Sequence, residues 1–156
     1  YKHYTLGYNY RMTNIQAAIL YGQIEQLPII ISKKKRIFDY YTEMLSQIPN
    51  VIIQKTEENT IQSNWMMGVR ILNNKLGYKH IEDYFKSKGV DLRPMFYPMS
   101  EHSYLKYVSN NKNESVATIL SNECFIVPCY PDMTEENTEL VYNTLKSYVE
   151  KYIDTF

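Results

Sequence analysis

The sequence lacks the features that mark several large classes of protein. Seventeen basic residues balance seventeen acidic ones, so no net charge favours nucleic acid or an anionic membrane as a partner. The apolar run at residues 27–31 contains Pro28, and every apolar run in the chain is far shorter than the roughly 20 residues that a membrane span requires. Neither a basic-then-apolar signal sequence nor an initiating methionine is present. We therefore expect a cytoplasmic fragment of a longer protein, with no nucleic-acid or membrane partner.

Cysteine is also scarce. The chain contains only Cys124 and Cys129, and neither has a His or Cys neighbour at a spacing that suggests a metal site. We expect two reduced thiols and no metal. The chain has 156 residues, 44% of them hydrophobic, which is enough for one compact core but cramped for two.

The apolar pattern begins with helices. Thr13 and Gln16 have the spacing of a capping box, so a helix should start at this point. Pro28 should break or restart that helix, because proline lacks an N–H and clashes with the preceding turn. A second helix is expected from Pro28 to about Gln47. Its core-facing residues are expected to be Ile30, Ile37, Tyr41, Met44 and Leu45.

The remainder alternates short strands with helices. Strands are expected at residues 51–53, 65–72, 90–93 and 125–127, and helices at residues 78–88 and 114–122. Gly89 should close the first of these helices in a left-handed conformation. Thr134 should cap a final helix. That helix is expected to bury Leu140, Val141, Thr144, Leu145, Tyr148 and Val149. This order of elements predicts an α/β layered domain with a small sheet.

Two basic or polar stretches are candidate anion sites. Residues 33–36 are all Lys or Arg, and we interpret them as a solvated helix face rather than a phosphate site, because no aromatic interleaving accompanies them. In residues 7–13 an Asn, two Tyr and an Arg come directly before a predicted helix N-terminus. An arginine fork and free helical N–H groups are suited to a carboxylate or a phosphate.

Three strings of residues carry a resemblance to a known family. Residues 7–18 read Gly-Tyr-Asn-Tyr-Arg-Met-Thr-Asn-Ile-Gln-Ala-Ala, residues 89–100 contain Arg-Pro-Met-Phe-Tyr-Pro-Met-Ser, and residues 127–136 read Val-Pro-Cys-Tyr-Pro-Asp-Met-Thr-Glu-Glu. Together with Trp65-Met66, they resemble, in order, segments of the DegT/DnrJ/EryC1/StrS sugar aminotransferases, in the perosamine-synthase-like branch. The resemblance covers nearly the whole chain.

The resemblance implies a fold and a division of the chain. The fold would be the C-terminal small domain of a fold-type I transferase that depends on pyridoxal 5'-phosphate (PLP), with a preceding helical segment and a small, mainly antiparallel sheet. Residues 1–12 would be an active-site segment at the end of the large domain. Residues 13–47 would be linking helices, and residues 48–156 would be the small α/β domain.

The resemblance also implies a reaction and partners. An amino group would move from glutamate to a nucleotide-linked 4-keto-6-deoxy sugar of the perosamine or viosamine type. PLP, shared with the missing large domain, would supply the electron sink. The protein would work as a homodimer whose sites use residues from both subunits.

Individual residues receive roles through the same resemblance. Asn9 matches the residue that reaches across the dimer to the cofactor phosphate, and Arg11 matches the arginine that holds a carboxylate of the amino donor. Tyr8 and Tyr10 are expected to line the same pocket. The residues expected near the sugar nucleotide are Arg93, Tyr97, Ser100 and His102.

Each assignment has a simpler alternative. The two tyrosines before the helix are also explained as packing residues. Arg93 has Asp91 and Glu101 as possible surface ion-pair partners, and His102 is displaced from the position where many family members carry a His. Trp65 is interpreted as a core residue rather than a substrate platform.

The lysine that carries the cofactor is missing from this pattern. In the family it precedes the first string, where this chain has only Lys2, which is too close and lacks the surrounding Ser and Gly residues. We therefore assign no catalytic residue and expect the chain alone to be inactive. Two alternatives remain open: a non-catalytic dimerisation or interaction module, and a PLP-dependent sugar dehydratase of the same fold.

Overall fold

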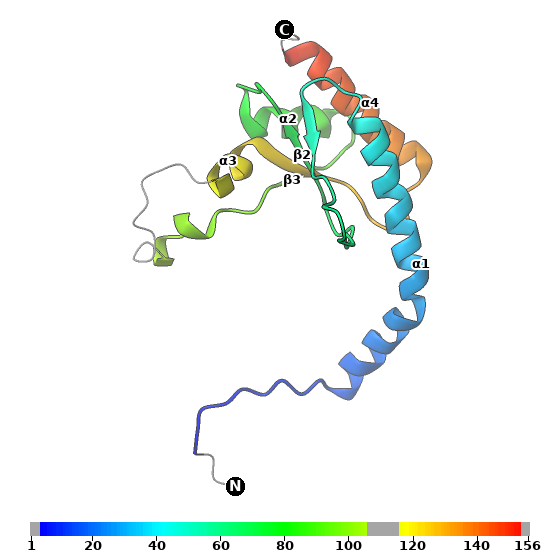
Figure 1. The fold of residues 1–156 in the computed structure, drawn as a ribbon, viewed down its shortest axis with the longest axis vertical. Coiled ribbons are helices and arrows are strands. Elements are labelled where there is room, and N and C mark those ends of the chain that lie inside the picture. The colour runs from blue at the N-terminus through cyan, green and yellow to red at the C-terminus, as the bar shows by residue number, and fades with distance from the viewer. Residues whose placement is uncertain (1–3, 106–115, 154–156) are drawn as a thin grey trace.

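The computed structural model describes residues 4–105 and 116–153, which form a small sheet covered by helices (Figure 1). The strand order is β1-β2-β4-β3, and each neighbouring pair is antiparallel. The expected α/β class with a small antiparallel sheet is confirmed. The helices and strands are α1 (Asn14–Leu45), β1 (Val51–Ile53), β2 (Met67–Ile71), α2 (Gly77–Ser87), β3 (Arg93–Pro94), η1 (Met99–Glu101), η2 (Ser103–Leu105), α3 (Val116–Glu123), β4 (Cys124–Val127) and α4 (Glu135–Tyr152).

The two faces of the sheet have different surroundings. Alternate residues of β2 are buried beneath side chains from α1, α2 and α4, as a period of two along a strand requires. Gly68 of β2 and Arg93 of β3 both pair with Ile126 of β4, so these three residues share the opposite face. Ile126 is buried, but it lies outside the main core cluster.

The helix α1 begins as predicted and then departs from the prediction. The Thr13 hydroxyl accepts from the N–H of Gln16, and the Gln16 side chain accepts from the N–H of Thr13, which completes the capping box. The helix then runs through Pro28 without a break, so the prediction of two helices was wrong. A proline removes one hydrogen bond and commonly kinks a helix. Figure 1 shows that α1 bends along its length instead of ending.

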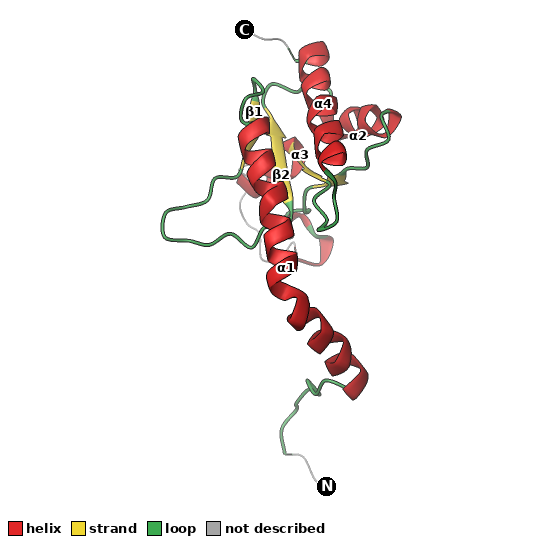
Figure 2. Cartoon of the chain, turned by 90° about the vertical axis from the view of Figure 1, so that its right-hand side faces the viewer, coloured by secondary structure: helices red, strands yellow, loops and turns green. Residues whose placement is uncertain are grey.

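The two halves of α1 have opposite environments. The second half packs on the sheet, where Ile37, Phe38, Tyr41 and Leu45 are buried. The first half projects away from the domain and carries exposed apolar side chains (Figures 1 and 2). Although α1 has 32 residues, no helix in the described part of the chain is apolar enough along its length to cross a membrane.

Several smaller expectations need correction. The strand expected at residues 90–93 is reduced to Arg93–Pro94, because the N–H of Val90 bonds back to the Phe85 carbonyl and closes α2 instead of joining the sheet. Gly89 has φ +79°, which confirms its left-handed closing role. Leu140 was expected in the core, yet it is exposed on α4. The other core residues expected on that helix are buried.

Tyr41 offers a direct test of how α1 is held on the sheet. Its buried hydroxyl donates to the Pro128 carbonyl at 2.8 Å, and burial raises the pKa of Tyr41, so the hydroxyl remains a donor. We expect Tyr41→Phe to lower the free energy of unfolding by about 1 kcal/mol, because the carbonyl loses its partner. Urea denaturation measures this change. Tyr21→Phe is the matched control on an exposed face and should have almost no effect; equal stability of both variants would contradict the anchoring role.

Candidate functional site

Residues 4–13 form an exposed segment ahead of α1. The Asn9 side-chain oxygen accepts from the N–H of Arg11 at 3.0 Å. Among residues 4–105 and 116–153, the Asn9 amide NH2 and the Arg11 guanidinium have no hydrogen-bond or ion-pair partner. Two sets of donors therefore stand close together at the start of a helix, an arrangement that suits an anion.

The two tyrosines of this segment are exposed. Tyr8 is 74% and Tyr10 is 89% exposed, and their ring centroids lie 6.1 Å apart. The alternative that they pack into the core of this chain is therefore wrong. Whether they line a substrate pocket stays a prediction.

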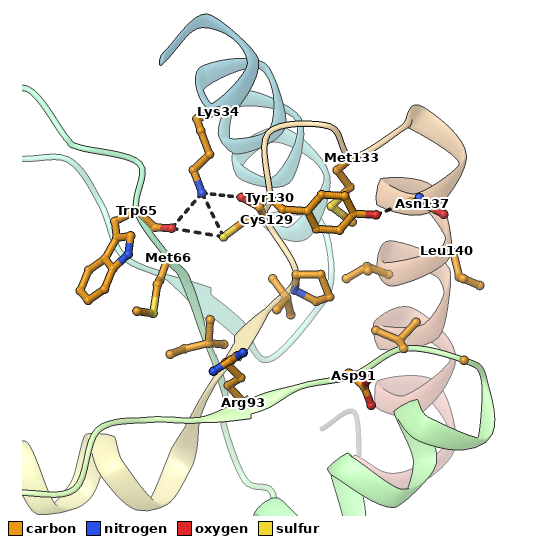
Figure 3. A pocket seen from close by; sticks show the side chains of 16 residues that line it. Lys34, Trp65, Met66, Asp91, Arg93, Cys129, Tyr130, Met133, Asn137 and Leu140 are labelled. Atoms are coloured by element: carbon orange, nitrogen blue, oxygen red, sulfur yellow. Dashed lines mark hydrogen bonds between the residues drawn. The ribbon is translucent and has the colours of Figure 1, made fainter. Parts of the chain in front are cut away.

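A second candidate site is a hollow where α1, β2, β3, β4 and α4 meet, which we call the sheet-end pocket (Figure 3). Its volume is about 650 Å³. Figure 3 shows Lys34 at one end, Trp65 and Met66 on one side, and Tyr130 and Asn137 on the opposite side. The lining is mainly apolar, and its residues are Lys34, Trp65, Met66, Gly89, Val90, Asp91, Arg93, Ile126, Val127, Pro128, Cys129, Tyr130, Met133, Asn137, Leu140 and Val141.

Lys34 ties three segments together at the end of this pocket. Its ammonium group donates to the Trp65 carbonyl at 2.8 Å and also to the Cys129 carbonyl (Figure 3). The Cys129 thiol lies 3.4 Å from the same nitrogen and donates to the Trp65 carbonyl. One cation thus fixes the segment before β2 and the loop after β4 to α1.

The neighbouring basic residues Lys33, Lys35 and Arg36 are exposed, as the interpretation of residues 33–36 as a solvated face predicts, but two of them also contact the loop after β4. Lys33 pairs with Asp132 at 2.6 Å, and Arg36 donates to the Met133 carbonyl at 2.9 Å. Lys35 alone makes a local pair, with Asp39 one turn along the helix. The local sequence does not predict these contacts, because the Asp132 carboxylate and the Met133 carbonyl lie 99 and 97 residues away along the chain.

Arg93 reaches toward the sheet-end pocket from the edge strand β3 (Figure 3). Neither of its expected partners holds it: no ion pair joins Arg93 to Asp91 or to Glu101 in the described chain, and Glu101 instead accepts from the Thr118 hydroxyl at 2.7 Å. The guanidinium is therefore available to an anionic ligand.

The loop after β3 brings several predicted site residues together. The rings of Tyr97 and His102 lie 5.2 Å apart edge to face, and His102 also lies 5.2 Å from Tyr104. Ser100 is exposed in the short helix η1 between them. The structure therefore places Tyr97, Ser100 and His102 in one aromatic loop that continues from Arg93.

Trp65 lies on the surface, so its assignment to the core was wrong. It is 66% exposed, and its ring stacks on Phe96, which is 63% exposed. Met67 and Val69 alternate with less buried neighbours, and the same alternation extended to residue 65 predicts a buried Trp65. The alternation applies only within a strand, and β2 starts at Met67, so Trp65 lies outside it. Phe96 was missed because nothing in its own segment predicts the contact.

The structure does not bring the two candidate sites together. The segment with Asn9 and Arg11 lies beyond the far end of α1, whereas Arg93 and the sheet-end pocket lie beside the sheet (Figure 1). Within one copy of this chain the two groups of residues act separately.

The arrangement of α1 and the four-stranded sheet recurs in solved aminotransferase structures. PseC of Helicobacter pylori, an aminotransferase involved in the biosynthesis of pseudoaminic acid, superposes with a TM-score of 0.84 over 97% of this chain and 41% of its own, at 15% identity. DesV of S. venezuelae superposes with a TM-score of 0.83 over 96% of this chain and 40% of its own, at 17% identity. These likenesses establish the fold alone.

The sequence identifies the family. Residues 1–146 match the DegT/DnrJ/EryC1/StrS aminotransferase family, and the chain belongs to it. The GDP-perosamine synthase of Escherichia coli O157:H7 is 27% identical over 148 residues, which are 95% of this chain and 39% of that protein. A UDP-4-amino-4,6-dideoxy-N-acetyl-beta-L-altrosamine transaminase of Campylobacter jejuni is 25% identical over 94% of this chain and 39% of its own length. The chain thus spans about two fifths of the length of these curated relatives.

Lys34 and Lys35 form a matched pair for testing whether the Lys34 contacts with the Trp65 and Cys129 carbonyls stabilise the fold. We expect Lys34→Met to lower the free energy of unfolding by about 2 kcal/mol, because two carbonyls lose a charged donor. Lys35→Met removes only an exposed pair one turn apart and should cost about 0.5 kcal/mol or less. Urea denaturation of both variants measures the difference. Equal losses would mean that Lys34 contributes no more than a surface lysine.

Proposed function

We propose that this chain is the rear part of a PLP-dependent aminotransferase that moves an amino group from glutamate to a nucleotide-linked 4-keto-6-deoxy sugar of the perosamine or viosamine type. The observation that carries the proposal is family membership over residues 1–146, joined to the exposed donors of Asn9 and Arg11. The relatives named as synthases or transaminases of amino sugars support this substrate class. We place the protein in the cytoplasm, where nucleotide-linked sugars would be available to it.

The proposed division of the chain follows its elements. Residues 1–12 belong to the end of the large domain as an active-site segment, because the described part of this range, residues 4–12, extends away from the sheet. Residues 13–47 link the two domains through α1, and residues 48–156 form the small domain. The exposed apolar first half of α1 supports this division, because a connecting helix needs a second surface to cover it.

The donors of the N-terminal segment fit part of the cofactor. The Asn9 amide NH2 suits a phosphate oxygen, and Asn9 is proposed to contact the PLP phosphate in the partner subunit's site. PLP supplies an electron sink for the transfer of the amino group. We propose that the lysine carrying it belongs to the large domain, outside residues 1–156. Lys33, Lys34 and Lys35 are unsuited to that role, because each is already held by groups of this chain.

The substrates are proposed to meet different residues. Arg11 holds a carboxylate of glutamate through its planar fork, a geometry that lysine does not offer. Tyr8 and Tyr10 line the donor side of that site. On the sugar side, the loop after β3 contributes Arg93, Tyr97, Ser100 and His102.

Arg11 gives the sharpest test of donor binding. In the protein that joins this chain to the large domain, we expect Arg11→Ala to raise the KM for glutamate about 100-fold, because a bidentate charged contact is lost. The KM for the nucleotide-linked sugar should change little. Steady-state kinetics with each substrate varied in turn measure both constants.

Two further variants complete this experiment. Arg11→Lys keeps the charge without the fork and should recover only part of the affinity for glutamate. Lys55→Ala removes an exposed positive charge elsewhere and should leave both constants unchanged. An unchanged KM for glutamate in Arg11→Ala would remove Arg11 from the donor site.

The first half of α1 favours a role in assembly. Ile15, Ile19 and Ile24 are 75%, 66% and 54% exposed, and Tyr21 is 65% exposed, so apolar side chains project from more than one side of this half of the helix. Exposed apolar surface on this scale usually contacts another protein surface. We propose that the large domain and a second copy of the chain share it, which gives the homodimer. A purely non-catalytic dimerisation module would use the same surface.

Light scattering tests this assembly surface. We expect the 156-residue chain to self-associate, because no described residue covers the apolar side chains on the first half of α1. The double change Ile19→Glu with Ile24→Glu should shift the chain to a monomer that still unfolds cooperatively, since both positions are exposed and outside the core. Ile61→Glu, at a fully exposed position away from α1, is the control and should not change the mass. A monomeric parent chain would refute the assembly proposal.

A further inference from the structure

An exposed aromatic pair next to the sheet-end pocket has no role in the function proposed above. The rings of Trp65 and Phe96 stack with centroids 6.1 Å apart and planes 30° apart. Each ring remains more than half exposed despite this contact, at 66% and 63%. Two large apolar rings that stack on each other at the surface and remain this exposed offer an aromatic platform on which a ligand ring can stack.

The backbone builds this platform from two segments that are distant in sequence. After Pro94 the chain leaves the sheet, and the Met95 methyl group comes to 3.1 Å from the position that a Cβ on Gly68 would occupy. The absence of a side chain at Gly68 therefore lets the loop cross close to β2. Phe96 follows directly and meets Trp65.

The tryptophan side of the platform is fixed as well. The Trp65 carbonyl accepts from Lys34 at 2.8 Å and from the Cys129 thiol at 3.4 Å. Figure 3 shows this carbonyl facing Lys34 while the indole ring points away from the centre of the pocket. A backbone held by two donors limits the movement of the ring, which lowers the entropic cost of stacking a ligand on it.

Arg93, which pairs with no residue of the described chain, lines the same pocket as the tryptophan of the platform. It comes three positions before Phe96. It shares the outer face of the sheet with Gly68 and forms no ion pair within the described ranges. A ring-stacking surface beside a free guanidinium fits a ligand that has an aromatic base and a diphosphate.

We propose that Trp65 and Phe96 stack the base of the nucleotide-linked sugar and that Arg93 binds its diphosphate. This inference rests on the proposed function for the substrate class. It adds specificity-determining residues to the sugar side of the site, because a ring platform and a charge select a nucleotide over a free sugar. The competing occupant of the same surface is an apolar patch of the large domain.

The chain carries its own probe for this contact. Trp65 is its single tryptophan, so emission excited at the red edge of the absorption band, where the sixteen tyrosines barely absorb, reports on this ring alone. GDP, UDP and dTDP are each titrated, and we expect at least one of them to quench the emission saturably. Inorganic pyrophosphate has no base and should leave the emission unchanged.

Variants assign the binding to the platform and the charge. We expect Phe96→Ala and Arg93→Ala each to weaken nucleotide binding about tenfold, the size of effect that one lost stacking or charged contact produces. Ile61→Ala changes a fully exposed side chain in the loop before Trp65 and should not alter the titration. In the protein that includes the large domain, Trp65→Ala should raise the KM for the nucleotide-linked sugar about tenfold and leave the KM for glutamate unchanged.

The outcomes separate this inference from the proposed function. Amino transfer to a nucleotide-linked sugar with an unchanged KM in Trp65→Ala would overturn the platform and leave the function standing. Quenching by a nucleoside diphosphate without any amino transfer would overturn the proposed function and leave the platform standing. No quenching by any of the three nucleotides, or quenching that Phe96→Ala and Arg93→Ala leave unaltered, would overturn the platform. A blue-shifted Trp65 emission in the longer protein with an unchanged KM would assign the surface to the large domain.

Discussion

The attachment of the second half of α1 to the loop after β4 determines where every other part of this domain lies. Lys34 and Tyr41 are seven positions apart, about two helical turns, so they project from the same side of α1. They donate to the carbonyls of Cys129 and Pro128, which are adjacent in the chain. Side-chain donors on a helix thus satisfy backbone acceptors that no strand reaches. The Trp65 carbonyl shares the same lysine, which brings the segment before β2 to the same point.

This attachment explains why the sheet-end pocket is open. The loop after β4 bonds to α1 by its carbonyl groups instead of continuing the sheet, so a hollow of about 650 Å³ is left between it and α4. Its lining is mainly apolar, and Arg93 is held at its edge by the short strand β3. An apolar part of a ligand would lose little hydrogen bonding on entering, and an anionic group on the ligand would meet the Arg93 guanidinium.

Local signals in the sequence predicted local structure well. The caps at Thr13 and Thr134 and the left-handed Gly89 were predicted because each depends on residues within one helical turn. The break expected at Pro28 was wrong, because one lost hydrogen bond does not end a helix whose flanking turns remain intact. The positions of Trp65 and Lys34 depend on carbonyls and rings from other segments, and no periodicity within their own segments contains that information.

The candidate site residues were predicted from the three strings that resemble the family, and the periodicity and charge of the sequence contributed less. Those strings located the exposed donors of Asn9 and Arg11 and the loop that starts at Arg93, but they gave no indication that α1 separates the two. The part of α1 between Asn14 and Lys34, which lines the sheet-end pocket, spans about 30 Å at the usual rise of 1.5 Å per residue, and this is far beyond the reach of any side chain. The two groups can therefore serve one substrate pair only if a second polypeptide surface lies between them. The exposed apolar half of α1 is the part of the chain that such a surface would cover, so the assembly and the proposed chemistry depend on the same helix.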